Sequence, residues 1–89
     1  MSSPELTLKE YLKVFNVVIL KGEKENQLYN LEGIKAWHDF DGYTCFLGYK
    51  DVTLTLLFHG RYSFDYDKKE NLSAFLVLLT KILKGVEHD

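Results

Sequence analysis

Hydrophobic residues near the start of the chain recur at intervals of three and four positions. This spacing places them on one side of a helix, and it predicts a helix over Leu8–Lys21. Thr7 and Glu10 have the spacing of a capping box at its start, and Gly22 follows it as a stop signal. The polar residues 22–27 show no periodicity, so we expect a loop there.

A second stretch of helical periodicity begins near the end of the chain. Asp67 and Glu70 have the spacing of an N-terminal cap, and Gly85 follows the last apolar residues of the pattern. The sequence therefore predicts a second helix that starts after Asp67 and ends before Gly85.

Between residues 31 and 66 the hydrophobic period changes to two, which is typical of β-strands. Asp41-Gly42 lies between two apolar runs and predicts a two-residue type I′ turn. Lys50-Asp51 predicts a second two-residue turn. The register that follows pairs Phe40 with Tyr43, His38 with Cys45, Ala36 with Leu47, Leu47 with Leu54, Cys45 with Leu56, and Tyr43 with Phe58.

The last turn of the sheet depends on where the charged residues lie. A two-residue loop at His59-Gly60 would bury Arg61 and Asp65, which is costly without partners. We therefore expect a three-residue loop, His59-Gly60-Arg61, which directs Tyr62, Phe64 and Tyr66 inward.

These elements predict one α+β domain over residues 1–89, in the order α-β-β-β-β-α. The four strands form an antiparallel meander, and both helices cover the same face. We call this covered side, which carries Ala36, Cys45 and Leu47, the inner face. The other side, which carries Trp37 and Phe46, is the outer face. Residues 28–31 add a short fifth strand or extend the first one.

Composition narrows the class of protein. The 89 residues are 46% hydrophobic and 27% charged, which is typical of a folded chain. A single cysteine excludes an internal disulfide and favours a reducing, cytoplasmic location. The first residues lack a basic segment followed by an apolar run, so we expect neither secretion nor membrane insertion. A net charge of -2 disfavours a nucleic-acid partner.

The outer face carries the main candidate binding surface. Trp37 lies opposite Phe46, Leu57 lies diagonally nearby, and Thr44 and Thr55 are neighbours. Contiguous apolar groups of this kind are typical of association surfaces. We expect a protein partner or self-association, through this face or an edge strand. Two alternatives stay open: residues 28–31 or the loop before them cover the face, or its aromatics stack on single-stranded nucleic acid.

His38 and Cys45 form a second candidate site on the inner face. Their predicted pairing brings an imidazole close to a thiol, as in a small-ligand or enzyme site that includes Tyr43. The ordinary interpretation is a small hydrophobic cysteine beside a histidine in the core. No third ligand or orienting residue is apparent, and familiar catalytic motifs are missing. We expect no metal, no cofactor and no enzymatic activity.

Several segments of the chain resemble a known family. They are Leu31-Glu32-Gly33-Ile34-Lys35-Ala36, Asp39-Phe40-Asp41-Gly42-Tyr43-Thr44, Leu54-Thr55-Leu56-Leu57-Phe58-His59 and Phe64-Asp65-Tyr66-Asp67. In these the chain is similar to small uncharacterised proteins of gamma-proteobacteria, catalogued as a domain of unknown function. The resemblance implies a bacterial cytoplasmic protein without an assigned activity, and it supplies no catalytic residue.

Overall fold

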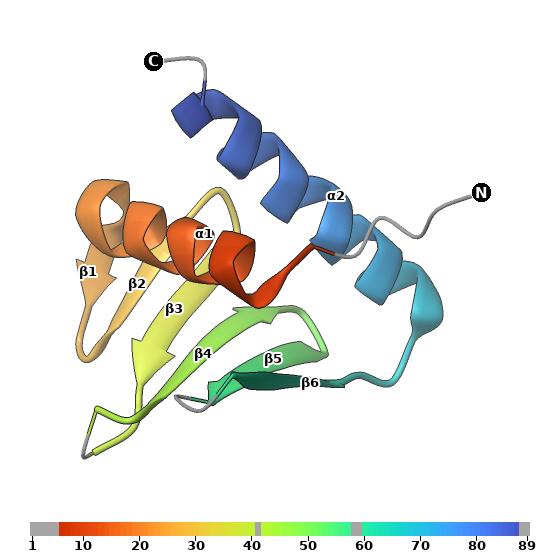
Figure 1. Cartoon of the computed structure of the whole chain (residues 1–89), viewed down its shortest axis with the longest axis horizontal. Coiled ribbons are helices and arrows are strands. Elements are labelled where there is room, and N and C mark those ends of the chain that lie inside the picture. The colour runs from red at the N-terminus through yellow and green to blue at the C-terminus, as the bar shows by residue number, and fades with distance from the viewer. Residues whose placement is uncertain (1–5, 41, 58–59, 88–89) are drawn as a thin grey trace.

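The protein consists of an antiparallel sheet covered on one face by two helices (Figure 1). The computed structural model describes residues 6–40, 42–57 and 60–87. The strands form one meander in which each pairs with the next along the chain. This architecture confirms the predicted α+β class, with six strands instead of four. The elements are α1 (Leu8–Lys21), β1 (Glu23–Glu25), β2 (Leu28–Leu31), β3 (Ile34–His38), β4 (Thr44–Tyr49), β5 (Val52–Leu57), β6 (Arg61–Asp65) and α2 (Lys69–Glu87).

The two additional strands come from the segment before β3. Residues 22–27 are not wholly a loop, because Glu23–Glu25 pairs with Leu28–Leu31 as a hairpin. Asn26 has a positive φ of 58° in the turn between them, a conformation that asparagine tolerates well. The three residues of β1 are exposed, so backbone hydrogen bonds form this edge strand without any apolar side chain. The alternation of apolar and polar residues could not reveal such a strand.

The central register is as predicted. Trp37 pairs with Phe46 and Ala36 with Leu47 between β3 and β4, and Leu47 pairs with Leu54 between β4 and β5. His38 also lies opposite Cys45, which in turn lies opposite Leu56. Alternation along these strands therefore separates the inner and outer faces where we expected.

The β3–β4 connection differs from the predicted turn. The Asp39 N–H donates to the Thr44 carbonyl oxygen at 2.8 Å, and the Gly42 N–H donates to the Asp39 carbonyl at 3.0 Å. Residues 40–43 therefore form a longer connection, and the pairing of Phe40 with Tyr43 on the inner face is wrong. Phe40 is fully exposed at 103%, because the covering helices do not reach this end of the sheet. Asp41, on which the type I′ turn depends, lies outside the described residues.

The β5–β6 connection begins one residue earlier than predicted. Leu57 pairs with Arg61, so residues 58–60 connect the strands, and Gly60 has a positive φ of 89°. Tyr62 now faces Leu56, and the inward direction of Tyr62 and Phe64 is retained because the register moves by an even number of residues. Tyr66 follows β6 and is exposed, contrary to its predicted inward position. Phe58 and His59, including the predicted pairing of Tyr43 with Phe58, lie outside the described residues.

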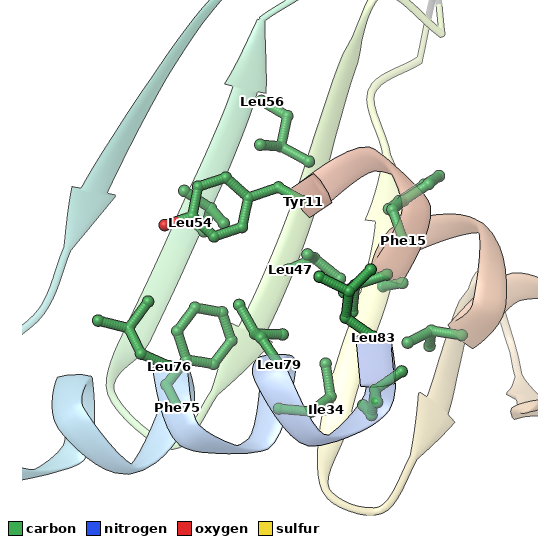
Figure 2. Close-up of a cluster of buried hydrophobic side chains, with 14 of the residues drawn as sticks. Tyr11, Phe15, Ile34, Leu47, Leu54, Leu56, Phe75, Leu76, Leu79 and Leu83 are labelled. Carbon is green, nitrogen blue, oxygen red and sulfur yellow. The ribbon is translucent and has the colours of Figure 1, made fainter. Parts of the chain in front are cut away.

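The core lies between the inner face and the two helices (Figure 2). Tyr11 of α1 is fully buried and meets Tyr62 and Phe64 edge-on, with ring centroids 5.0 and 5.9 Å apart. Its hydroxyl accepts a hydrogen bond from the Leu6 N–H at 3.1 Å, which fixes the chain entering α1. Phe75 of α2 stacks near Tyr49 and contacts Phe64 edge-on, so both helices pack on the same apolar surface.

The ends of α1 follow the predicted signals. The Glu10 N–H donates to Thr7 Oγ1 at 3.2 Å, and the Thr7 N–H donates to Glu10 Oε1 at 2.9 Å, which completes the capping box. The hydrogen bond from the Thr7 N–H lowers the pKa of Glu10. Gly22 is the C-cap of α1. A side chain does not fit at this position, because a Cβ would lie 2.5 Å from the Val18 carbonyl oxygen and 2.8 Å from that of Asn30.

The start of α2 is held by a residue far away in the sequence. The Leu72 N–H donates to the Lys68 carbonyl, so Lys68 occupies the N-cap position and the predicted Asp67 cap is wrong. Asp51, in the β4–β5 turn, accepts from the Lys68 N–H at 3.0 Å and from Asn71 Nδ2 at 3.2 Å. The helix also continues to Glu87 instead of ending before Gly85, because a single glycine disfavours a helix by only about 1 kcal/mol.

We expect Asp51→Ala to lower the free energy of unfolding by about 1 kcal/mol, because both hydrogen bonds to the start of α2 are lost. Urea denaturation followed by circular dichroism measures this change. Asp67→Ala is the matched control and should have a smaller effect. Equal losses for the two variants would contradict the role assigned to Asp51.

Candidate functional site

The outer face is the side of the sheet opposite the two helices (Figure 1). Strand alternation assigns it a mixture of small, polar and aromatic side chains. No helix or strand of the described chain lies across it. Its positions on the four strands from β3 to β6 are Lys35, Trp37, Thr44, Phe46, Gly48, Thr53, Thr55, Leu57, Arg61, Ser63 and Asp65.

Trp37 and Phe46 form the centre of this face. Their rings stack with centroids 5.3 Å apart and planes 13° apart, and both residues are half-buried. The indole also lies against Gly48, since a Cβ at that position would be 3.0 Å from Trp37 Cζ3 and 3.1 Å from Cη2. We call this pair the aromatic platform. Glycine at position 48 lets the platform lie close to the backbone of the sheet.

Residues 28–31, which could have covered the outer face, lie beside the aromatic platform instead. Tyr29 pairs with Ala36, so β2 extends the sheet next to β3 and does not fold across the outer face. The register of β2 and β3 places Leu28 opposite Trp37, and both residues border a hollow of about 500 Å³ next to the β1–β2 turn. Its lining consists of Asn26, Gln27, Leu28, Lys35, Trp37 and His38. The indole therefore remains partly accessible.

The other predicted surface residues lie at the margin of the platform. Thr55 pairs with Phe46, and Thr44 pairs with Leu57. Thr44, Thr55 and Leu57 are all half-buried. Leu57 also borders a groove of about 220 Å³ together with Leu8 and Cys45. Trp37 and Phe46 thus form a close pair, whereas Leu57 lies at the margin of this pair.

Charged side chains surround the platform in a pattern that the sequence analysis did not use. Lys35 on β3 and Asp39 just after it lie two residues before and after Trp37. On β6, Arg61 and Asp65 lie two residues before and after Ser63, and all four charged residues are exposed. The period of two places them on the outer face. Alternation along the strands already predicts Lys35, Asp39 and Asp65 on this face, whereas Arg61 was expected in the loop before β6. Its pairing with Leu57 places it on the strand instead.

His38 and Cys45 are paired as predicted, but their surroundings differ. His38 is exposed, and its Nδ1 lies 2.9 Å from the Asp39 carbonyl oxygen, to which it donates. The core interpretation of His38 is therefore wrong, because this end of β3 extends beyond the helices. Cys45 packs against the core, and burial raises the pKa of its thiol. A reactive thiolate requires the opposite shift.

The described part of the chain contains neither a cluster of metal-ligating side chains nor a helix that could span a membrane. Within residues 6–40, 42–57 and 60–87, no three His, Cys, Asp or Glu side chains gather closely enough to hold a metal ion. Asp39 and Asp65 lie next to β3 and on β6, with two strands between them. Neither described helix combines the length and the apolar character needed to cross a membrane.

The fold and this surface define a small α+β protein with a six-stranded meander, helices on one face and an aromatic platform on the other. Residues 6–89 match the family described as "Protein of unknown function (DUF3081)", and the chain belongs to that family. This match confirms the resemblance to a family of unknown function. Neither a curated protein nor a solved structure matches the chain.

The raised pKa of Cys45 leads to a test of thiol reactivity. We expect a disulfide-exchange reagent at neutral pH to modify Cys45 at least about tenfold more slowly in the native chain than in urea, because little thiolate is present. The native rate should continue to rise above the pH at which an ordinary thiol is already ionised. Absorbance of the released thiol measures both rates, and equal rates in the two states would contradict a structural Cys45.

Gly48→Ala should shift the indole of Trp37 and lower stability by about 1 kcal/mol, because the added Cβ would lie 3.0 Å from the ring, closer than an ordinary contact. Trp37 is the only tryptophan, so its emission reports the displacement directly and should move to longer wavelength. Gly85→Ala is the control, since a Cβ there meets nothing within 4 Å. An unchanged emission spectrum in Gly48→Ala would show that the indole does not lie against Gly48.

Proposed function

We propose that this protein is a non-enzymatic module that associates with another protein through the outer face of its sheet. The observation that carries the proposal is the half-buried stack of Trp37 on Phe46 on the side that the helices leave open. Tryptophan and phenylalanine are enriched at the centres of protein interfaces. A platform with a polar surround has the composition of such an interface.

The charges around the platform favour a protein over single-stranded nucleic acid. Sheets that bind single strands combine stacking aromatics with a positively charged groove. Here Lys35 and Arg61 are matched by Asp39 and Asp65, and the edge strand adds two exposed glutamates, Glu23 and Glu25. The excess of carboxylates would repel a phosphate backbone.

The edges of the sheet favour association through the face. β1 has only three residues, and all of them are charged and exposed. On β6, Arg61, Ser63 and Asp65 are exposed in alternation. Short, charged edge strands discourage the addition of another strand. The predicted edge-strand route of association is therefore less well supported than the aromatic platform.

The surroundings of Cys45 favour a role without catalysis. An inner-face enzyme site would need Cys45 as a nucleophile, yet burial raises the pKa of its thiol, and His38 donates to a backbone carbonyl. The proposal therefore includes no cofactor and no metal. A single, half-buried free cysteine suits a reducing compartment, and the proposal includes a cytoplasmic location.

Photo-cross-linking in cells tests this function. Thr55 pairs with Phe46, so a benzophenone amino acid at position 55 should form an adduct with a protein. Ser73, exposed on α2, is the matched control position and should form few adducts. Trp37→Ala should reduce the yield at position 55 by about tenfold, since truncation of an interface tryptophan removes much of the binding energy.

Mass spectrometry of the adducts decides between the candidate partners. Protein adducts from position 55 that depend on Trp37 support the proposal. Adducts with nucleic acid from this position would establish the stacking alternative instead. The absence of any adduct that depends on Trp37 would overturn the proposed function.

A further inference from the structure

We propose that the partner is a second copy of this chain, packed outer face against outer face about a two-fold axis that crosses the strands at the aromatic platform. The inference rests on the proposed function and names the partner for that same surface. It depends on a second observation, the symmetry of the charges around Trp37 and Phe46.

The outer face has a central row and two flanks. Trp37 pairs with Phe46, Phe46 with Thr55, and Thr55 with Ser63, so these residues form a row perpendicular to the strands. The register also fixes which residues lie on each side of it. One flank consists of Lys35, Gly48, Thr53 and Asp65, and the other consists of Asp39, Thr44, Leu57 and Arg61.

A two-fold axis along the central row exchanges the two flanks. It places Lys35 of one copy over Asp39 of the other, and Arg61 of one copy over Asp65 of the other. Each pair has opposite charge, and symmetry generates each pair twice. Four ion pairs would therefore surround the aromatic centre, which makes the outer face complementary to itself.

The alternative axis does not give this match. A two-fold axis parallel to the strands, between β3 and β4, would place β1 over β6. Glu23 lies in the same flank as Asp65, since Glu23 pairs with Asn30 and Asn30 pairs with Lys35. This arrangement would bring two carboxylates together and would leave Lys35 over Gly48. The proposed axis also has one unfavourable contact, because Glu25 pairs with Leu28 next to Trp37 and therefore lies over its own copy at the β1 end of the row. One such carboxylate contact stands against four ion pairs, whereas the axis parallel to the strands gives two carboxylate contacts and no ion pair. The balance of charges favours the axis along the row.

The dimensions suit a packed pair of sheets. Two sheets stack about 10 Å apart, a separation that a lysine or arginine reaching toward an aspartate can span. Lys35 and Asp39 are four residues apart, or roughly 13 Å along the strand, so the ion pairs would form a rim around the rings. Asp39 Oδ1 accepts from the Phe40 N–H at 2.6 Å, which orients the carboxylate and leaves Oδ2 for a partner.

Charge reversal tests this arrangement by sedimentation equilibrium. Lys35→Asp brings carboxylates together across the axis, and Asp39→Lys brings ammonium groups together. Each variant alone should raise the dimer dissociation constant by at least about tenfold. An equimolar mixture of the two should recover a dimer close to the wild type in affinity, because every rim contact in the mixed dimer joins opposite charges.

A second pair of variants guards against local damage to the β3–β4 connection. Arg61→Asp and Asp65→Arg are the equivalent charge reversals on β6, where both residues lie within the strand. Each variant alone should weaken the dimer, and their mixture should recover it. Trp37→Ala should give a folded monomer, with circular dichroism as the check. Weakening by the single variants and recovery in the mixtures would support the two-fold arrangement.

Two results would overturn the inference. One is a wild-type chain that stays monomeric at about 1 mM, which corresponds to negligible self-affinity. The other is a dimer that is insensitive to Trp37→Ala or is not recovered in either mixture of folded variants. A monomeric chain whose position 55 still cross-links to a different protein would refute the second copy as partner while leaving the proposed function intact. A chain that is monomeric and also forms no Trp37-dependent adduct at position 55 would refute both the second copy as partner and the proposed function.

Discussion

The pairing of β3 with β4 is the constraint on which the rest of the structure depends. It sets Trp37 opposite Phe46 and Ala36 opposite Leu47. Because directly paired residues share a face of the sheet, a slip of one residue between β3 and β4 would turn one of the two strands over. Either the indole would then lie under the helices or Leu47 would lie in water. The buried inner face and the aromatic outer face are therefore two results of one register.

The helices complete this division by covering only one side. Tyr11 and Phe75 anchor α1 and α2 in the same core, and the Asp51 carboxylate holds the start of α2 against the β4–β5 turn. With both amphipathic helices packed on the inner face, the outer face carries no cover from the described helices and strands. Gly48 then allows the indole to lie close to the backbone of β4. The aromatic platform is therefore left open because both helices pack on the inner face.

Local patterns were sufficient for much of the fold. The α1 boundaries and the registers of β3 with β4 and of β4 with β5 depend on residues close together in the sequence. Thr7, Glu10 and the Lys50-Asp51 turn could therefore be interpreted from the sequence. The β1 strand was missed because its pairing uses the backbone of charged residues. The β5–β6 turn was misplaced because both loop positions direct Tyr62 inward, so burial does not distinguish them.

The remaining errors concern contacts between distant parts of the chain. The Lys68 N–H meets Asp51, which is 17 residues away, and no local motif encodes that contact. The exposure of His38 and Phe40 depends on how far the helices reach over the sheet, which strand alternation does not report. For the candidate site, the sequence supplied the Trp37–Phe46 pair, but the flanking charges acquired meaning only once the register to β6 was known.

Acrylamide quenching of the Trp37 fluorescence tests the central claim most directly, because this is the only tryptophan of the chain. In dilute solution the account predicts an indole that the quencher reaches. As the chain concentration rises, the quenching constant should fall by several-fold as a second outer face covers the ring. A quenching constant that does not change with concentration, or an indole already shielded in the dilute chain, would contradict the account.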